Sequence, residues 1–139
     1  MNLSRRSAIA LAATVLALSV PALAMAQSGG ALAARSSDMG GVRVVVTPKD
    51  VAAKSAWEFK VVMDTHIKPL DDDLTKTAVL EDDEGRKYMP LSWQGDKPGG
   101  HHREGVLRFS APSEQVKSFE LQIQGSGEES KRVFQWTMK

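Results

Sequence analysis

The stretch Ala56–Asp64, Ala-Trp-Glu-Phe-Lys-Val-Val-Met-Asp, decides the fold class, because large apolar side chains recur at every second position. These apolar positions are Trp57, Phe59, Val61 and Met63. Successive side chains of a strand point to opposite faces, so the pattern gives one buried face and one wet face. It predicts a strand of an antiparallel sheet, with Trp57 and Phe59 in the core.

Short β-type runs separated by turn residues continue to the end of the chain. We expect seven strands, over residues 42–47, 56–64, 75–81, 87–93, 105–111, 119–123 and 133–138. No segment shows a convincing apolar helix period. Gly85 closes an Asp-Asp-Glu-Gly turn and can adopt the positive φ that a hairpin needs. The pattern predicts an all-β domain, an immunoglobulin-like antiparallel β-sandwich.

Residues 1–26 have the three parts of a cleaved export signal. Arg5 and Arg6 form a positive start, 8–20 is apolar, and Ala24-Met25-Ala26 offers the small residues that a signal peptidase reads. The apolar run is short for a membrane span. We therefore expect a periplasmic or secreted protein with no membrane span after cleavage. Residues 4–9 resemble part of a twin-arginine signal, and an ordinary Sec signal is the alternative.

Cleavage after Ala26 leaves one domain's length of chain. Residues 27–41 are rich in Ser, Gly and Ala and predict a disordered leader, so the sandwich is expected over 42–139. Loss of the two signal arginines leaves 16 basic against 17 acidic residues, and this balance argues against nucleic acid as a partner. The absence of cysteine excludes disulfides and thiolate metal sites. We expect a monomer.

All three histidines fall in loops that strand parity places at one end of the sandwich. If each strand reverses the direction of the one before, the loops 65–74, 94–104 and 125–131 share an end. His66 follows Asp64-Thr65 in the first loop, and His101 and His102 lie in Gly-Gly-His-His-Arg in the second. Parity thus brings His66 towards His101 and His102, although they are far apart in sequence.

These residues form a candidate metal site. The candidate donors are His66, His101, His102, Asp64 and Asp72, the last taken from the run Asp71-Asp72-Asp73. A first-row ion needs three or four donors at about 2.0–2.2 Å, and a set without sulfur favours zinc or copper(II). Adjacent histidines point to opposite faces of an extended segment, so only one of His101 and His102 readily faces a given ion.

Two other interpretations of the same loops stay open. The histidines can be structural, with one ring packed on Trp93 and with Arg103 paired to the acidic run. The loop end can also bind a non-metal ligand or a protein. No catalytic motif is present: the chain has no Gly-x-Ser-x-Gly, no phosphate-binding glycine loop and no cysteine nucleophile. We therefore expect a protein that is not an enzyme and has no catalytic residues.

Two motifs resemble a family of small exported prokaryotic β-sandwich domains without assigned function. The first is Trp57-x-Phe59-x-Val61 with Asp64-Thr65-His66, and the second is Gly99-Gly100-His101-His102-Arg103-x-Gly105-x-Leu107-x-Phe109, with Gly85-Arg86-x-Tyr88 between them. The resemblance covers roughly residues 42–138. It implies an exported β-sandwich and no known site residues. The chain departs from periplasmic copper carriers, which have a histidine near the mature N-terminus or His/Met clusters.

From the sequence we expect an exported, non-enzymatic domain that binds a divalent transition metal at its His-bearing end. The alternative is an accessory module that contacts an envelope or secreted protein through loops or an edge strand, with structural histidines. The two differ in what the fold must present. A metal site needs at least three convergent donors, whereas an interaction module needs an exposed apolar patch.

Overall fold

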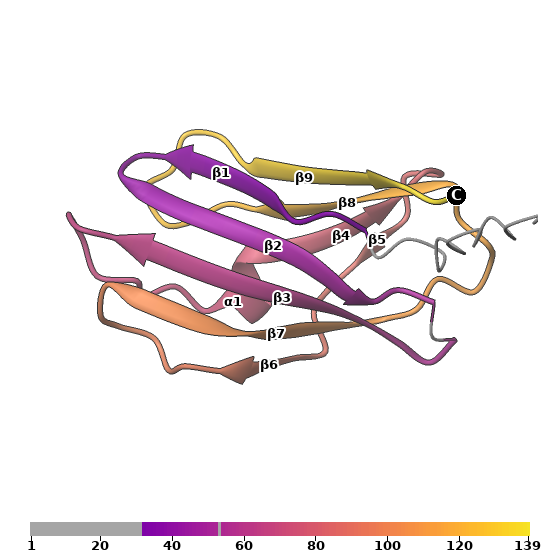
Figure 1. The fold of residues 1–139 in the computed structure, drawn as a ribbon, viewed down its shortest axis with the longest axis horizontal. Coiled ribbons are helices and arrows are strands. Elements are labelled where there is room, and N and C mark those ends of the chain that lie inside the picture. Colours follow the sequence, from indigo (N-terminus) through magenta and orange to yellow (C-terminus); the bar gives the residue numbers. More distant parts are fainter. Residues whose placement is uncertain (1–31, 53) are drawn as a thin grey trace, which may run out of the picture.

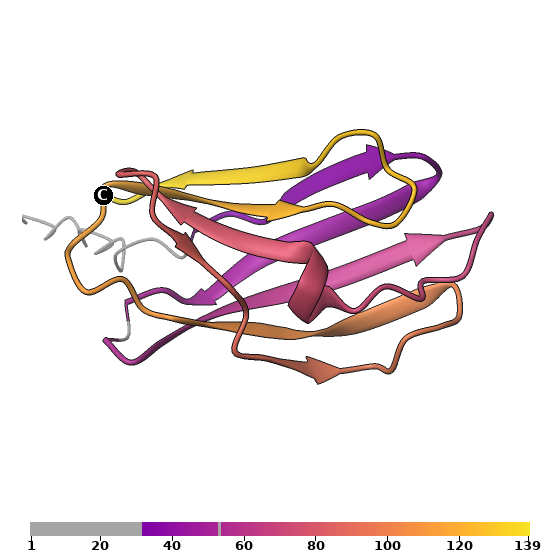
Figure 2. The same cartoon turned by 180° about the vertical axis from the view of Figure 1, so that it is seen from behind.

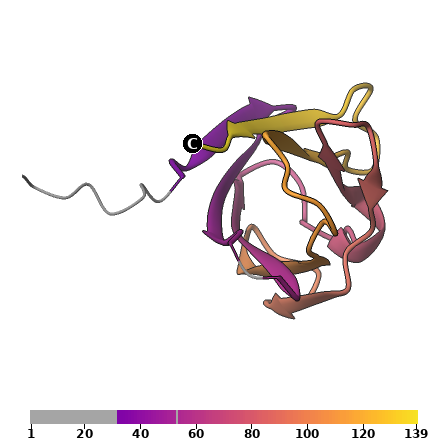
Figure 3. The ribbon, with the colours of Figure 1, turned by 90° about the vertical axis from the view of Figure 1, so that its right-hand side faces the viewer.

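The computed structural model describes residues 32–52 and 54–139, which form two antiparallel sheets packed face to face (Figure 1). Viewed from one end, the two sheets enclose a common interior (Figure 3). The all-β sandwich is confirmed. The predicted signal peptide and the first part of the predicted leader lie outside the described residues. In the described part of the chain no helix is long and apolar enough to cross a membrane.

The strand order is that of an immunoglobulin domain. The five-stranded sheet runs β1-β2-β3-β7-β6, with β1 Arg35–Met39, β2 Val42–Asp50, β3 Ala56–Thr65, β7 His102–Ser110 and β6 Ser92–Gly95. The four-stranded sheet runs β5-β4-β8-β9, with β5 Lys87–Tyr88, β4 Ala78–Asp82, β8 Ser118–Ile123 and β9 Arg132–Thr137. The order β2-β3-β7-β6 corresponds to strands A-B-E-D, and β4-β8-β9 to C-F-G.

The core is built on an aromatic cluster between the sheets. Trp57 lies edge-on to Phe119 with centroids 4.9 Å apart, and Phe119 stacks on Trp136 at 5.5 Å. Phe59 is fully buried beside them. These contacts confirm Trp57 and Phe59 as core residues and follow directly from the alternation in β3. Trp93 is only partly buried against this core.

The predicted leader ends earlier than its composition indicated, because β1 lies inside it. Gly40 and Gly41 take φ values of 57° and 74°, which allow the tight turn that returns the chain into β2. Arg35 then pairs with Val46 and Met39 with Val42, in unbroken antiparallel register. Backbone pairing at a sheet edge needs no apolar period, so the polar sequence gave no strand signal.

The strand expected over residues 75–81 begins later, after one turn of helix, α1 (Leu74–Thr77). Asp73 caps this turn: its side chain accepts hydrogen bonds from the backbone N–H of Thr75 at 3.0 Å and from the Thr75 hydroxyl at 2.7 Å. β4 then starts at Ala78. The sequence gives no signal for this turn, since a single capped turn is too short to show an apolar period.

The segment expected as one strand over 87–93 is two short strands in different sheets. β5 pairs with β4 and β6 pairs with β7, and the chain crosses between the sheets at Met89–Leu91 (Figure 2). Pro90 lacks the N–H that a continuous ladder requires, so the strand stops there. Met89 is 56% exposed on this crossing.

We expect Trp57→Ala to lower the free energy of unfolding by about 3–5 kcal/mol, because it leaves a cavity in the aromatic cluster. Chemical denaturation monitored by far-UV circular dichroism measures the change. Val133→Ala, on the outward face of β9 and 47% exposed, is the control and should stay within about 0.5 kcal/mol of the wild type. A Trp57→Ala protein as stable as this control would contradict the core assignment.

Candidate functional site

The three loops that parity grouped do meet at one end of the sandwich, here called the loop end (residues 65–74, 94–104 and 125–131). The Thr65 N–H donates to the His101 carbonyl at 2.9 Å. Leu70 exchanges two backbone hydrogen bonds with the second loop, donating to Gly100 and accepting from Gly99, both at 2.9 Å. In the third loop the Ser126 N–H donates to Asp72 Oδ2 at 3.0 Å.

The three loops share one end of the sandwich even though the strand predicted over residues 87–93 is divided into β5 and β6. β5 is antiparallel to β4 and β6 is antiparallel to β7, and the chain keeps its direction through the crossing at Met89–Leu91 (Figure 1). The number of chain reversals between β3 and β7 is therefore the same as predicted. The loops consequently gather where the sequence placed them.

Arg103 ties the first two loops together from below. Its guanidinium is buried, with a relative exposure of 1%, on the inward face of β7. Nη1 donates to the carbonyls of Leu70 at 3.2 Å and Asp72 at 2.7 Å, and Nη2 donates to the carbonyl of Asp96 at 3.3 Å. Its charged plane lies 5.5 Å from the centroid of the Trp93 ring.

One interpretation of the sequence made the histidines structural, with one ring packed on Trp93 and Arg103 paired to the acidic run. The contacts of Arg103 correct it in two respects. The group packed on Trp93 is the Arg103 guanidinium and not a histidine ring. Arg103 also bonds the backbone carbonyls of Leu70 and Asp72 and not the carboxylates of the acidic run. Burial lowers the pKa of Arg103, while the negative charges of Asp72 and Asp96 raise it.

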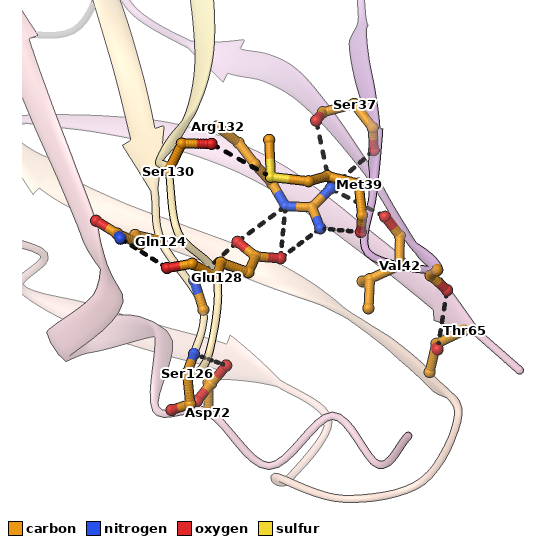
Figure 4. A network of polar contacts seen from close by, with 12 residues as sticks. Ser37, Met39, Val42, Thr65, Asp72, Gln124, Ser126, Glu128, Ser130 and Arg132 are labelled. Carbon is orange, nitrogen blue, oxygen red and sulfur yellow. Dashed lines mark hydrogen bonds and ion pairs between the residues drawn. The ribbon is translucent and has the colours of Figure 1, made fainter. Parts of the chain in front are cut away.

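Arg132 is a second buried arginine at the loop end, and it joins the β1–β2 hairpin to the β8–β9 loop (Figure 4). It is 2% exposed and forms an ion pair with Glu128, whose side chain is also buried. Nη1 donates to the carbonyls of Ser37 at 3.0 Å and Val42 at 2.9 Å, and Nη2 donates to the carbonyl of Met39 at 2.8 Å. The side chain thus holds the β1–β2 hairpin against β9, across the gap between the two sheets.

Glu128 remains charged in this buried position. Burial raises the pKa of its carboxyl, but hydrogen bonds from Arg132 and from the Gly125 N–H, together with the charge of Arg132, bring the pKa below its ordinary value. The Gly125 N–H donates to Glu128 Oε2 at 3.0 Å. The carboxylate therefore shapes the β8–β9 loop and neutralises Arg132 at once.

The predicted donors are only partly brought together. His102 Nδ1 lies 2.6 Å from Asp64 Oδ1 on the outward face of the five-stranded sheet, and His102 Nε2 lies 3.9 Å from Glu104. His101 and His66 are exposed, and within residues 32–52 and 54–139 neither side chain has a hydrogen bond or ion pair. Asp72 is hydrogen-bonded to Ser126 in the third loop (Figure 4).

Within residues 32–52 and 54–139, no group of three or more His, Cys, Asp or Glu is placed to hold a metal ion. The five predicted donors form one Asp–His pair, two exposed histidines and one aspartate bound to a serine. Zinc or copper(II) binding stays a prediction, supported by a carboxylate that orients an imidazole in the way common at metal sites.

The sequence interpretation missed Arg132 and Glu128 and gave Arg103 different partners. The signal for Arg132 and Glu128 was weak: a charge pair four residues apart in a polar turn, where no helix supports such a pair. Arg103 could have been suspected from the alternation of β7, because it falls on the same face as Leu107 and Phe109. A charged residue in phase with core residues predicts a buried cation.

A second surface lies away from the loop end, on the Met89–Leu91 crossing. Met89 is 56% exposed and Leu91 is 60% exposed, with Pro90 between them. The strands on either side are short sheet edges, because β5 has two residues and β6 has four. The Leu91 N–H donates to the Arg108 carbonyl at 2.7 Å, which fixes this segment to β7.

Comparison with known proteins finds similarity among solved structures. No protein-family model matches the chain, and no curated protein matches it. Among solved structures, the chain is similar to a DUF4426 family protein from Pseudomonas aeruginosa PAO1, with a TM-score of 0.46 and 16% sequence identity. The similarity covers 73% of this chain and 92% of that chain. Nothing about a function is transferred at this level of similarity.

We expect the pKa of His102 to lie above the ordinary histidine value. The hydrogen bond to Asp64 raises it most, burial opposes the rise, and the charges of Asp64, Glu104 and Asp96 add to it. The pair therefore stabilises the fold fully below the pKa of an unfolded histidine, and this contribution is lost as pH rises through the folded-state pKa.

An NMR pH titration of the His102 ring in the wild type and in Asp64→Asn measures this effect. The pKa of His102 should fall in Asp64→Asn. Glu58→Gln changes a carboxylate on the same sheet face that pairs with Arg108, so it serves as the control and should leave the pKa unchanged. An equal pKa of His102 in the wild type and Asp64→Asn would show that the pair does not form in solution.

We expect Arg103→Met to lower the free energy of unfolding by about 3 kcal/mol, because buried carbonyls left without a donor cost about 1–3 kcal/mol each. The loss should be concentrated at the loop end. Hydrogen exchange should therefore speed up at the Leu70 and Gly99 amides, whereas the β8 and β9 amides stay protected. Arg108→Met, which removes a half-exposed ion pair, is the control. Unchanged protection of Leu70 in Arg103→Met would refute the role given to Arg103.

Proposed function

We propose that this protein is an exported, non-enzymatic domain that acts by binding a protein partner in the periplasm or outside the cell. The export signal expected over residues 1–26 and the lack of a catalytic motif in the sequence support this proposal. The immunoglobulin-like topology is compatible with it, since such sandwiches present loops and edges around a rigid core.

The observation that carries the proposal is the exposure of Met89 and Leu91. Large apolar side chains at the surface lose contact with water when a partner covers them, and each Å² of apolar area buried contributes about 25 cal/mol. Methionine adapts to differently shaped partners because its side chain is unbranched and flexible. Pro90 fixes the backbone φ angle between them, and the hydrogen bond from the Leu91 N–H to the Arg108 carbonyl holds the segment on β7.

The strands beside the crossing add a second means of recognition. β5 pairs only with Leu80 and Glu81 of β4, so β5 leaves the outer edge of β4 uncovered at Val79, next to Ala78, whose N–H donates to the Leu74 carbonyl of α1. An edge with free backbone groups can accept an added strand from another chain. A protein segment that pairs there would lie close to Met89 and Leu91. This favours a protein partner with an extended apolar segment.

Site-specific photo-crosslinking in the source organism tests the proposal. A photo-reactive amino acid replaces Leu91 in the full chain, including residues 1–26, and the same replacement at the exposed Val133 on β9 is the control. We expect a discrete adduct with another protein at position 91, in the exported fraction, and none at position 133.

The doubly substituted protein Met89→Ser, Leu91→Ser supplies the second arm, with the photo-reactive residue moved to Lys87 in β5. The adduct at Lys87 should disappear in this background, while the melting temperature stays near that of the wild type because both side chains are exposed. Equal adducts at positions 91 and 133, or retention of the adduct after the double substitution, would contradict the proposal.

A further inference from the structure

We propose that Met89 is an oxidation-sensitive residue that regulates the Met89–Leu91 surface, with a peroxide as the oxidant. Oxidation of its thioether to the sulfoxide releases the protein partner, and reduction of the sulfoxide allows the partner to return. This inference rests on the proposed function, because it concerns regulation of the same surface.

Methionine is the only sulfur-containing residue of this chain, because the sequence has no cysteine. Cysteine thiolates are the usual first targets of oxidants, and in their absence an oxidant reacts with exposed thioethers. Met1 and Met25 lie in the predicted export signal, outside the described residues. The described part of the chain holds the other methionines, which are Met39, Met63, Met89 and Met138.

Exposure separates Met89 from the other described methionines. Met89 is 56% exposed, whereas Met63 is 6% exposed and lies in the core of the sandwich. Met138 is half-buried against this core. Met39 is half-buried in β1, and its sulfur lies 3.8 Å from the Ser130 hydroxyl. Oxygen transfer requires the oxidant to reach the sulfur atom, so Met89 should be oxidised first.

The oxidation of Met89 is a two-electron oxygen transfer. The thioether sulfur attacks one oxygen of hydrogen peroxide, a sulfur–oxygen bond forms, the O–O bond breaks, and the second oxygen leaves as water with both protons. Sulfur is oxidised by two electrons, and the peroxide is reduced by the same two. A methionine sulfoxide reductase reverses the change with a dithiol as the reductant, which becomes a disulfide as water is released.

The sulfoxide changes what the Met89–Leu91 surface offers to a partner. It replaces an apolar, flexible thioether with a polar and chiral group. A partner that covers the surface would then bury the sulfoxide oxygen away from water, which costs free energy unless a donor meets it. Oxidation therefore removes affinity that the proposed function assigns to the burial of apolar area.

The fold should tolerate this change, because the side chain of Met89 lies outside the buried core. The backbone on either side is held by other contacts. The Tyr88 hydroxyl donates to Asp82 Oδ2 at 3.0 Å, and the Leu91 N–H donates to the Arg108 carbonyl at 2.7 Å. Oxidation at Met89 thus alters the binding surface without unfolding the domain.

Oxidation of the purified protein tests the first step without any partner. Protein from the exported fraction is treated with hydrogen peroxide, and the sulfoxide at each methionine is followed over time by peptide mass spectrometry. We expect oxidation several-fold faster at Met89 than at Met39, Met63 and Met138, with an unchanged melting temperature once Met89 is converted. Equal rates at Met89 and Met138, or a lower melting temperature at that point, would overturn the proposal.

Photo-crosslinking from position 87 in the source organism tests the effect on the partner. In each strain the adduct after brief peroxide treatment is divided by the adduct in untreated cells. This ratio should fall in the otherwise unsubstituted chain and in the control Met138→Leu, and stay constant in Met89→Leu, which has no oxidisable sulfur at the surface. An equal fall in Met89→Leu, or no fall in the unsubstituted chain, would contradict the proposal.

Met89→Gln supplies an arm that needs no oxidant. Glutamine resembles the sulfoxide in length and polarity, so the adduct from position 87 should be lost in untreated cells. An adduct of full strength in this variant would refute the inference alone. Absence of the adduct from the unsubstituted chain would refute the proposed function and this inference with it, so the two failures are distinguishable.

Discussion

A guanidinium group that is buried away from water needs oxygen acceptors, and the loop end of this sandwich is arranged around two such groups. Arg132 finds an acceptor at each of its three nitrogens, whereas Arg103 is bonded through Nη1 and Nη2 and its Nε–H has no partner in the described part of the chain. Arg103 takes carbonyls from the loops 66–73 and 95–101. Arg132 takes carbonyls from the β1–β2 hairpin and a carboxylate from the β8–β9 loop. Since the loops supply the acceptors, their paths are fixed by two side chains that project inward from strands.

This arrangement leaves space beneath the loops. A sandwich core is closed where large side chains from both sheets interdigitate, as Trp57, Phe119 and Trp136 do towards the other end. At the loop end smaller residues such as Val44 and Ile123 face each other, and the guanidinium groups hold the chain above them. The result is an apolar cavity with a charged rim. The exposed Met89–Leu91 crossing lies away from this cavity, and its path depends on a proline and not on a buried charge.

Much of this fold was accessible from the sequence because period-two alternation is a strong signal. β3 and β8 were predicted nearly to their ends, and parity alone placed three distant loops together. β1 was missed because an edge strand can pair through its backbone with no apolar face. α1 was missed because one turn capped by Asp73 has no period, and the break at Pro90 was hidden by apolar neighbours.

The candidate site was harder to predict than the fold. Parity correctly brought the loop that holds His66 to the loop that holds His101 and His102, but the position of a residue in a loop does not give the direction of its side chain, so the three-donor cluster did not follow. Arg103 and Arg132 were difficult for a different reason: their partners are backbone carbonyls, which every residue has.

The most direct test of this account is a crystal of the protein pressurised with xenon, which enters dry apolar cavities without needing a polar partner. The account predicts a xenon peak between Met63 and Ile123, within the cavity beneath the loops. The absence of xenon there, with the two methyl-bearing side chains in mutual contact, would contradict it, because the buried guanidinium groups would then not be holding the loop end open.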